Sequence, residues 1–169
     1  RALEAYEESL TIRRDLIKAQ PGSIQTQRNL TTTLDNVANT LRDINPSHAL
    51  NLYQESLTIN RYLTEIQPGS LHAKQNLAIS LNNVAEILNN SDPERALNLY
   101  QESLAINRHL TETQPGSIQT QRNLATSLNN VADILHGVNP SYALRLYEES
   151  LTIRHNLATR LSGDFRTRR

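Results

Sequence analysis

The chain has 169 residues, and its 17 Lys and Arg balance its 17 Asp and Glu, so the formal net charge is zero. A balanced charge argues against a general nucleic-acid binder, because such a protein needs excess positive charge to neutralise phosphates. The absence of Cys excludes disulfides, thiolate metal sites and cysteine nucleophiles, and the absence of any apolar run near 18 residues argues against a membrane span.

The sequence is built from a repeat of 47 residues. One tyrosine recurs at that interval, at Tyr6, Tyr53, Tyr100 and Tyr147. Three repeats, 21–67, 68–114 and 115–161, align without a gap, and the first two share 27 of 47 residues. Residues 1–20 match the second half of a repeat, and 162–169 lie in register with the beginning of one. Since the chain also has no Met, we expect it to be a piece of a longer protein, with 162–169 the truncated or decayed start of a further repeat.

Each repeat predicts two helices, and residues 1–20 predict one helix of the second kind ahead of them. In the first repeat, the first helix is expected from about Ser23 to Leu41, because apolar residues recur there at helical spacing. The second helix is expected from about Pro46 to Ile66, because Asn45 suits an N-cap and Pro suits the first helical position. The pattern recurs in the next two repeats and no segment alternates like a strand, so the predicted fold class is all-α with seven helices.

The repeat resembles a known family. Its signature residues are best seen in the second repeat, at Ala85, Ala96, Tyr100 and Ser103. Their spacing is similar to that of the tetratricopeptide repeat, with one residue fewer in the turn. The run Ser-Leu-Asn-Asn-Val-Ala, at 80–85 and 127–132, looks like the long-helix tetratricopeptide units of kinesin light chains and of many bacterial signalling proteins. The usual repeat has about 34 residues, so both helices are expected to be longer here.

This resemblance implies a fold, a function and a location. The implied fold is a right-handed superhelical solenoid of antiparallel helix pairs, whose first helices line a concave groove. The implied function is protein–protein interaction, in which the groove binds a peptide or a partner protein. A cytoplasmic location is implied in the same way.

The first helix of each repeat carries a polar face opposite its Leu and Val stripe, and the family's groove positions fall on that face. The peptide-binding residues that the resemblance implies are Arg28, Asn29, Asp35, Asn36, Asn39, Gln75, Asn76, Asn82, Asn83, Glu86, Arg122, Asn123, Asn129, Asn130 and Asp133. In related grooves an Asn at the position of Asn36, Asn83 and Asn130 bonds the backbone of an extended peptide. Asn suits this role because its amide offers both a donor and an acceptor.

The recurring Asn residues are also compatible with two roles that involve no ligand: they bond one another between adjacent helices, or they are inherited without use because the repeats are so similar. The position before Asn36, Asn83 and Asn130 is Asp or Asn and never Lys, so we do not expect capture of a terminal carboxylate. A peptide of mixed polarity, with a basic residue facing Glu86 or Asp133, fits the groove better.

No enzyme, metal or cofactor is predicted for this chain. Its five His keep no metal-ligand spacing, and each Pro-Gly-Ser turn has a single Gly and no phosphate-cradling loop. Ser56 and its equivalents Ser103 and Ser150 are expected on the packed side of the second helix, where a small side chain permits close approach. Glu55 and its equivalents are expected on a solvated face, with pairing to the adjacent repeat as the alternative.

Two rival functions compete with peptide binding. A helical-repeat RNA reader uses polar side chains in every repeat, but the zero net charge and the lack of a stacking residue in every repeat speak against it. A structural spacer or oligomerisation arm of a larger signalling protein is the second rival. It is supported by apolar stripes at both ends of the chain, which favour a homo-oligomer through exposed solenoid ends.

Overall fold

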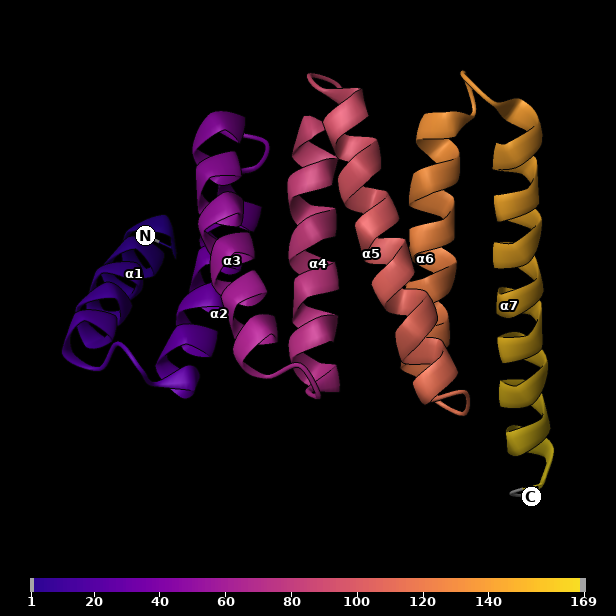
Figure 1. The fold of residues 1–169 in the computed structure, drawn as a ribbon, viewed down its shortest axis with the longest axis horizontal. Helices are drawn as coiled ribbons and strands as arrows, with labels where there is room; N and C mark the ends of the chain where they lie inside the picture. The colour runs from indigo at the N-terminus through magenta and orange to yellow at the C-terminus, as the bar shows by residue number, and fades with distance from the viewer. Residues whose placement is uncertain (1, 168–169) are drawn as a thin grey trace. The chain divides into compact units, whose positions relative to one another are not determined.

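The structure is a computed structural model that describes the backbone of residues 2–167 and the side chains of residues 4–162. Over that range the chain consists of helices and short turns, without a β-strand, which confirms the predicted all-α class. Figure 1 shows the helices in chain order: α1 (Ala2–Ala19), α2 (Ile24–Leu41), α3 (Pro46–Ile66), α4 (Leu71–Leu88), α5 (Pro93–Thr113), α6 (Ile118–Leu135) and α7 (Pro140–Thr167).

The chain forms two compact bodies, which we call the N-terminal body (Arg1–Ser91) and the C-terminal body (Asp92–Arg169). In the N-terminal body α1 packs on α2, α2 on α3, and α3 on α4. In the C-terminal body α5 packs on α6, and α6 on α7. The boundary between the bodies falls inside the second sequence repeat, between its two helices.

Side-chain caps mark the beginnings of α2, α3, α4 and α6. The Ser23 side chain accepts a hydrogen bond from the backbone N–H of Thr26, and Ser70 and Ser117 do the same in the next two repeats. The Asn45 side chain caps α3 in the same way, with Pro46 at the first helical position. Each such cap satisfies one backbone donor that the helix leaves unpaired, and it contributes about 1 kcal/mol.

Apolar stripes of the helices form the core of each body. Leu34, Val37 and Ala38 of α2 are at most 1% exposed, as their helical spacing predicts. The burial of each large side chain stabilises the fold by roughly 1.5–3 kcal/mol. Ser56 and its two equivalents are also fully buried, which confirms the prediction that they lie on the packed side of the second helix.

A buried polar contact joins α3 to α4 and recurs between α5 and α6. The Asn60 Nδ2 donates to Ser80 Oγ at 2.8 Å, and Asn107 Nδ2 donates to Ser127 Oγ at the same distance. All four side chains are at most 2% exposed. Amides therefore do bond between helices in this protein, but those amides belong to the second helices.

The last helix is longer than the earlier second helices, because α7 continues as one helix to Thr167. The interpretation of 162–169 as the truncated or decayed start of a further repeat stays a prediction. The earlier repeats begin with Pro, which cannot continue a helix without losing a backbone hydrogen bond, whereas residue 162 is Ser. The side chains of 163–169 lie outside the described ones.

Candidate functional site

The candidate site is the polar side of the first helices, which we call the first-helix face of each body: that of α2 and α4 in the N-terminal body, and that of α6 in the C-terminal body. All fifteen residues that the resemblance implies for peptide binding lie on these three helices, five on each. None of them is fully buried: each side chain is either exposed or partly exposed. The three stretches are therefore accessible to a ligand within each body.

Asn36, Asn83 and Asn130 keep their amide groups available. Asn36 is exposed, and the other two are partly exposed. Among the described residues none forms a side-chain hydrogen bond with these three amides, so Asn36 and Asn83 are not bonded to each other in the N-terminal body. The alternative of an amide ladder between neighbouring first helices therefore does not describe α2 and α4.

Three other predicted residues form side-chain hydrogen bonds with other residues of this chain. Asn29 and Asn123 each accept from the Gln four residues earlier on the same helix, at 2.9 and 2.8 Å. Arg28 Nη2 donates to Gln67 Oε1 at 2.9 Å, at the end of α3. These contacts hold the side chains in place and reduce what they can offer to a ligand. The side chains of four further predicted residues make no hydrogen bond or ion pair within the described part of the chain: Gln75, Asn76, Arg122 and Asn129.

Two of the predicted residues bond the recurring tyrosine of the second helix. The Tyr53 hydroxyl donates to Asn39 Oδ1 at 2.6 Å, and the Tyr147 hydroxyl donates to Asp133 Oδ1 at 2.6 Å. The bond to Asp133 raises the pKa of Tyr147, with smaller contributions from burial and from the carboxylate charge. Sequence reasoning missed these pairs, although the separation of 14 residues between the partners is the same in both repeats.

Glu86 forms an ion pair across the first-helix face of the N-terminal body. Arg42 Nη1, at the end of α2, donates to Glu86 Oε1 of α4 at 2.8 Å. Sequence reasoning expected Glu86 to face a basic residue of a peptide and did not include Arg42. The pair joins two successive first helices, and with both side chains partly exposed it contributes about 0–1 kcal/mol.

Asp35 is the acidic residue of α2, and it is largely withdrawn from water. Its Oδ1 has no accessible surface and no hydrogen-bond partner. Burial raises the pKa of the Asp35 carboxyl to about 6, and a hydrogen bond with Ser56 of α3 opposes part of that shift. The equivalent residues in the next two repeats are amides, Asn82 and Asn129. The Oδ1 of Asn82 is also buried without a partner, so this position faces inward in both repeats of the N-terminal body.

Tyr53 connects these groups into one cluster. Its side chain is 1% exposed, and burial raises the pKa of its hydroxyl to about 12. The Arg42 charge lowers that pKa, and the Asp35 and Glu86 charges raise it. Asp35, Arg42 and Glu86 therefore each lie within electrostatic range of the Tyr53 hydroxyl. Together with Tyr53 they come from α2, α3 and α4 of the N-terminal body.

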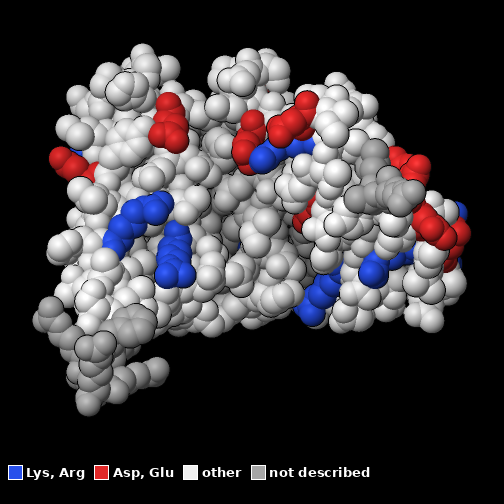
Figure 2. Space-filling view, turned by 180° about the vertical axis from the view of Figure 1, so that it is seen from behind, with Lys and Arg blue, Asp and Glu red and all other residues white. Residues whose placement is uncertain are grey.

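The charges of the first-helix face are mixed. Figure 2 shows, on the one side that it draws, Lys and Arg as well as Asp and Glu in small separate groups among uncharged residues, without a continuous path of Lys and Arg among the described ones. A groove that follows a nucleic-acid backbone needs such a positive path. The face instead offers amides together with isolated charges of both signs.

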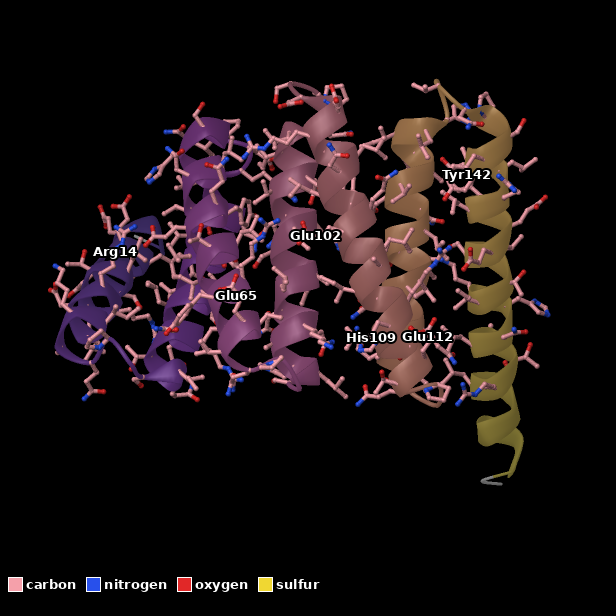
Figure 3. The ribbon with its side chains drawn as sticks, viewed as in Figure 1. Arg14, Glu65, Glu102, His109, Glu112 and Tyr142 are labelled. Carbon is pink, nitrogen blue, oxygen red and sulfur yellow. The ribbon has the colours of Figure 1, made fainter. Side chains whose placement is uncertain are left out.

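The opposite face belongs to the second helices, and Figure 3 labels side chains from it, such as Arg14 on α1. Arg14 forms an ion pair with Glu55 of α3, and Arg108 of α5 forms one with Glu149 of α7 at 3.0 Å. These contacts support the pairing alternative for the recurring Glu over a purely solvated face. All four side chains are about 36–45% exposed, so each pair contributes about 0.2–1 kcal/mol.

A cleft opens at the equivalent place on this opposite face in each body. In the N-terminal body it lies between α1, α2 and α3, has a volume of about 540 Å³ and includes Leu30 and Tyr62 in its lining. In the C-terminal body it lies between α5, α6 and α7, has a volume of about 480 Å³ and includes Leu124 and Asn156. The packing of the repeat thus produces both clefts.

The fold and this surface define an all-α protein of packed helix pairs with an amide-rich polar face. Among the described residues there is no group of three or more His, Asp or Glu arranged to hold a metal ion. No described helix combines the length and hydropathy needed to cross a membrane. No protein-family model matches the chain, and a search of curated proteins gives no match.

Proposed function

We propose that this chain is a protein–protein interaction module of the tetratricopeptide type, and that its first helices bind an extended segment of a partner on their polar side, at α2 and α4 in the N-terminal body and at α6 in the C-terminal body. The observation that carries the proposal is that the amide groups of Asn36, Asn83 and Asn130 are accessible and without hydrogen-bond partners among the described residues. They occupy the same position in three repeats.

The chemistry of these amides suits a peptide backbone. An extended segment presents unpaired N–H and C=O groups, and each Asn amide is able to donate to one and accept from another. A neutral hydrogen bond contributes about 0.5–1.5 kcal/mol, so each such bond accounts for roughly a twofold to tenfold gain in affinity. Backbone bonds give affinity without sequence preference, and neighbouring charged and polar side chains supply the preference.

The test is a peptide selection with matched variants. A random peptide library is selected against the chain and against the triple variant Asn36→Ala, Asn83→Ala, Asn130→Ala. A peptide enriched on the parent is expected to bind the triple variant at least tenfold more weakly. The control is Asn51→Ala with Asn98→Ala, which truncates two exposed Asn residues on the second helices and is expected to leave binding unchanged.

A stability measurement accompanies this binding test. Each of the three Asn→Ala changes replaces an accessible, unbonded side chain, so the free energy of unfolding is expected to change by less than about 0.5 kcal/mol per site. A large loss of stability in the triple variant contradicts the proposal, because it assigns the amides a structural role. A peptide that binds the parent and the triple variant equally well contradicts it too.

The oligomerisation arm is retained as a second candidate because of one observation on α7. Leu151 is 68% exposed, whereas its repeat equivalents Leu57 and Leu104 are 9% and 6% exposed. Leu144 of the same helix is 57% exposed. Exposed apolar side chains of this kind favour association with another surface. If this candidate holds, sedimentation equilibrium shows an oligomer that Leu151→Glu dissociates, and peptide selection gives no motif that depends on the three Asn residues.

A further inference from the structure

One face of α7 is open in the C-terminal body. The helix that packs along α7 is α6, and among the described helices of this body none covers the other side of α7 (Figure 1). Leu144 and Leu151 are 57% and 68% exposed. They are seven residues apart, so they lie two helical turns from each other on the same face. We call the face formed by Leu144, Leu151 and the exposed Arg154 the α7 outer face.

The other second helices show what covers this face elsewhere in the chain. The residues at the position of Leu151 in α1, α3 and α5 are 6%, 9% and 6% exposed: Leu10, Leu57 and Leu104. Each of these second helices packs on the first helix that follows it. Three positions further along, Asn60 and Asn107 donate hydrogen bonds to that following helix. This side of a second helix is therefore an interface for a first helix, and α7 presents the same interface on its outer face.

We infer that the α7 outer face binds an amphipathic helix of a partner protein, and that this helix has the side-chain pattern of the repeat's first helices. The pattern is a stripe of Leu, a small hydroxyl residue three positions later, Leu at four positions and Val at seven. The chain has three buried examples of it: Leu30, Thr33, Leu34 and Val37 on α2; Leu77, Ser80, Leu81 and Val84 on α4; Leu124, Ser127, Leu128 and Val131 on α6. This inference goes beyond the proposed function, because it assigns a second surface and a helical ligand instead of an extended one.

Neither a folded second copy nor the described end of the chain supplies this helix. The first-helix stripes are already buried, with Leu34 and Leu81 both 0% exposed, so a second copy has no open stripe to offer. The second helices α3 and α5 end at Ile66 and Thr113, before the turn that leads to the next first helix, whereas α7 remains helical to Thr167. The described residues that follow the equivalent point of α7 therefore do not turn back onto its outer face. For this reason we assign the face to a helix of a partner.

Arg154 indicates which version of the pattern fits best. It stands where α3 has Asn60, whose amide donates to Ser80 of the following first helix. The second helix α1 also has an Arg at this position, Arg13, and the first helix that packs on α1 has Thr33 at the position of Ser80. The Thr33 hydroxyl donates to the carbonyl four residues earlier in its own helix, at 3.1 Å, so it needs no amide from a neighbour. The α7 outer face is therefore expected to bind the α2 pattern more tightly than the α4 pattern.

The experiment uses a fluorescent peptide with the sequence of residues 21–42, which contains α2, as the probe. Short isolated helices are only marginally stable in water, so the peptide has a hydrocarbon staple between the exposed positions of Gln25 and Asn29. Fluorescence anisotropy measures its binding to the full chain. We expect saturable binding that Leu151→Glu weakens by about 10–100-fold, because a charge replaces a buried apolar contact. The control is Ile12→Glu, at a 54% exposed position on α1, which is expected to leave binding unchanged.

Two altered probes test the side-chain pattern. The same peptide with Leu34→Glu loses the centre of its stripe and is expected not to bind. A peptide of residues 68–89, which contains α4 and is stapled at the equivalent positions, is expected to bind several-fold more weakly than the α2 peptide, because Ser80 finds no Asn partner on α7. Equal affinity of the two peptides overturns the role given to Arg154.

The outcomes separate this inference from the proposed function. A stapled α2 peptide that does not bind the parent, or that binds Leu151→Glu equally well, overturns the inference while the first-helix face stands. A peptide that loses binding on the triple Asn→Ala variant instead lies on the first-helix face, which also overturns it. Sedimentation equilibrium that shows a dimer of the chain dissociated by Leu151→Glu assigns the α7 outer face to a second copy and contradicts the partner helix.

Discussion

Asp35→Asn is expected to stabilise the free protein near neutral pH. Burial holds the pKa of the Asp35 carboxyl at about 6, compared with 3.8 for an ordinary Asp. A difference of about two pKa units corresponds to about 3 kcal/mol that the folded state loses when this carboxyl ionises. Asn removes the charge but leaves a buried amide oxygen without a partner, as Asn82 already has. We therefore expect the free energy of unfolding to rise by about 1–3 kcal/mol at about pH 7.

The pH dependence has a defined sign. The folded-state pKa of Asp35 is raised, so the folded protein holds this proton more tightly than the unfolded chain does. The stability that comes from the proton is fully present below the unfolded-state pKa, and it is lost as the pH rises through about 6. The advantage of the variant over the parent is therefore largest at about pH 7 and nearly absent at about pH 4.

Urea unfolding followed by circular dichroism measures this difference at the two pH values. Other carboxylates titrate in the same range, and the comparison between parent and variant removes their contribution. Asp43→Asn serves as the control, because it removes an exposed charge and is expected to change stability by less than about 0.5 kcal/mol at either pH. The reasoning is refuted if Asp35→Asn lowers stability at about pH 7, or if its effect is the same at both pH values.

Three further substitutions test the packing. Asn107→Ala is expected to lower the free energy of unfolding by about 1–3 kcal/mol in urea titrations, because it removes the buried bond to Ser127; a change below about 0.5 kcal/mol contradicts this. Tyr53→Phe is expected to lower the free energy of unfolding, measured by thermal unfolding, by about 0.5–1.5 kcal/mol, because it removes the bond to Asn39. Tyr62→Phe, at an exposed position, is expected to change it very little, and equal effects of the two substitutions contradict the reasoning. Glu149→Gln is expected to cost about 0.2–1 kcal/mol, an effect that shrinks in high salt; an effect independent of salt points away from an ion pair.

The local features of the fold were predictable because they depend on neighbours in the sequence. The first helix was expected from about Ser23 because apolar residues recur there at helical spacing, and the second from about Pro46 because Asn45 suits an N-cap; the structure confirms both starts. The burial of Val37 and Ser56 followed from helical periodicity and the small side chain repeated every 47 residues. The continuation of α7 beyond residue 162 was not predicted, because the register of the repeat was given more weight than the missing Pro.

The candidate site was predictable only as a set of positions. The sequence indicates which side of a first helix is polar, because that depends on helical spacing alone. It does not indicate which of those polar groups are already used by the chain. Asn36 and Asn39 are both exposed Asn residues three positions apart, yet the first has a free amide and the second accepts the Tyr53 hydroxyl. That difference depends on where α3 crosses α2.

By itself, then, the sequence determined the repeat, the helices and their caps, and the polar side of each first helix, because each is set within a few residues along the chain. Only the tertiary structure decided which charged side chains are buried and which are paired. Asp35 and Asp43 are the same residue type eight positions apart, but one is largely buried with a pKa of about 6 and the other is 92% exposed. The cause is that burial and pairing depend on side chains from other helices, such as Ser56 of α3 beside Asp35, and a one-dimensional pattern does not specify their distance.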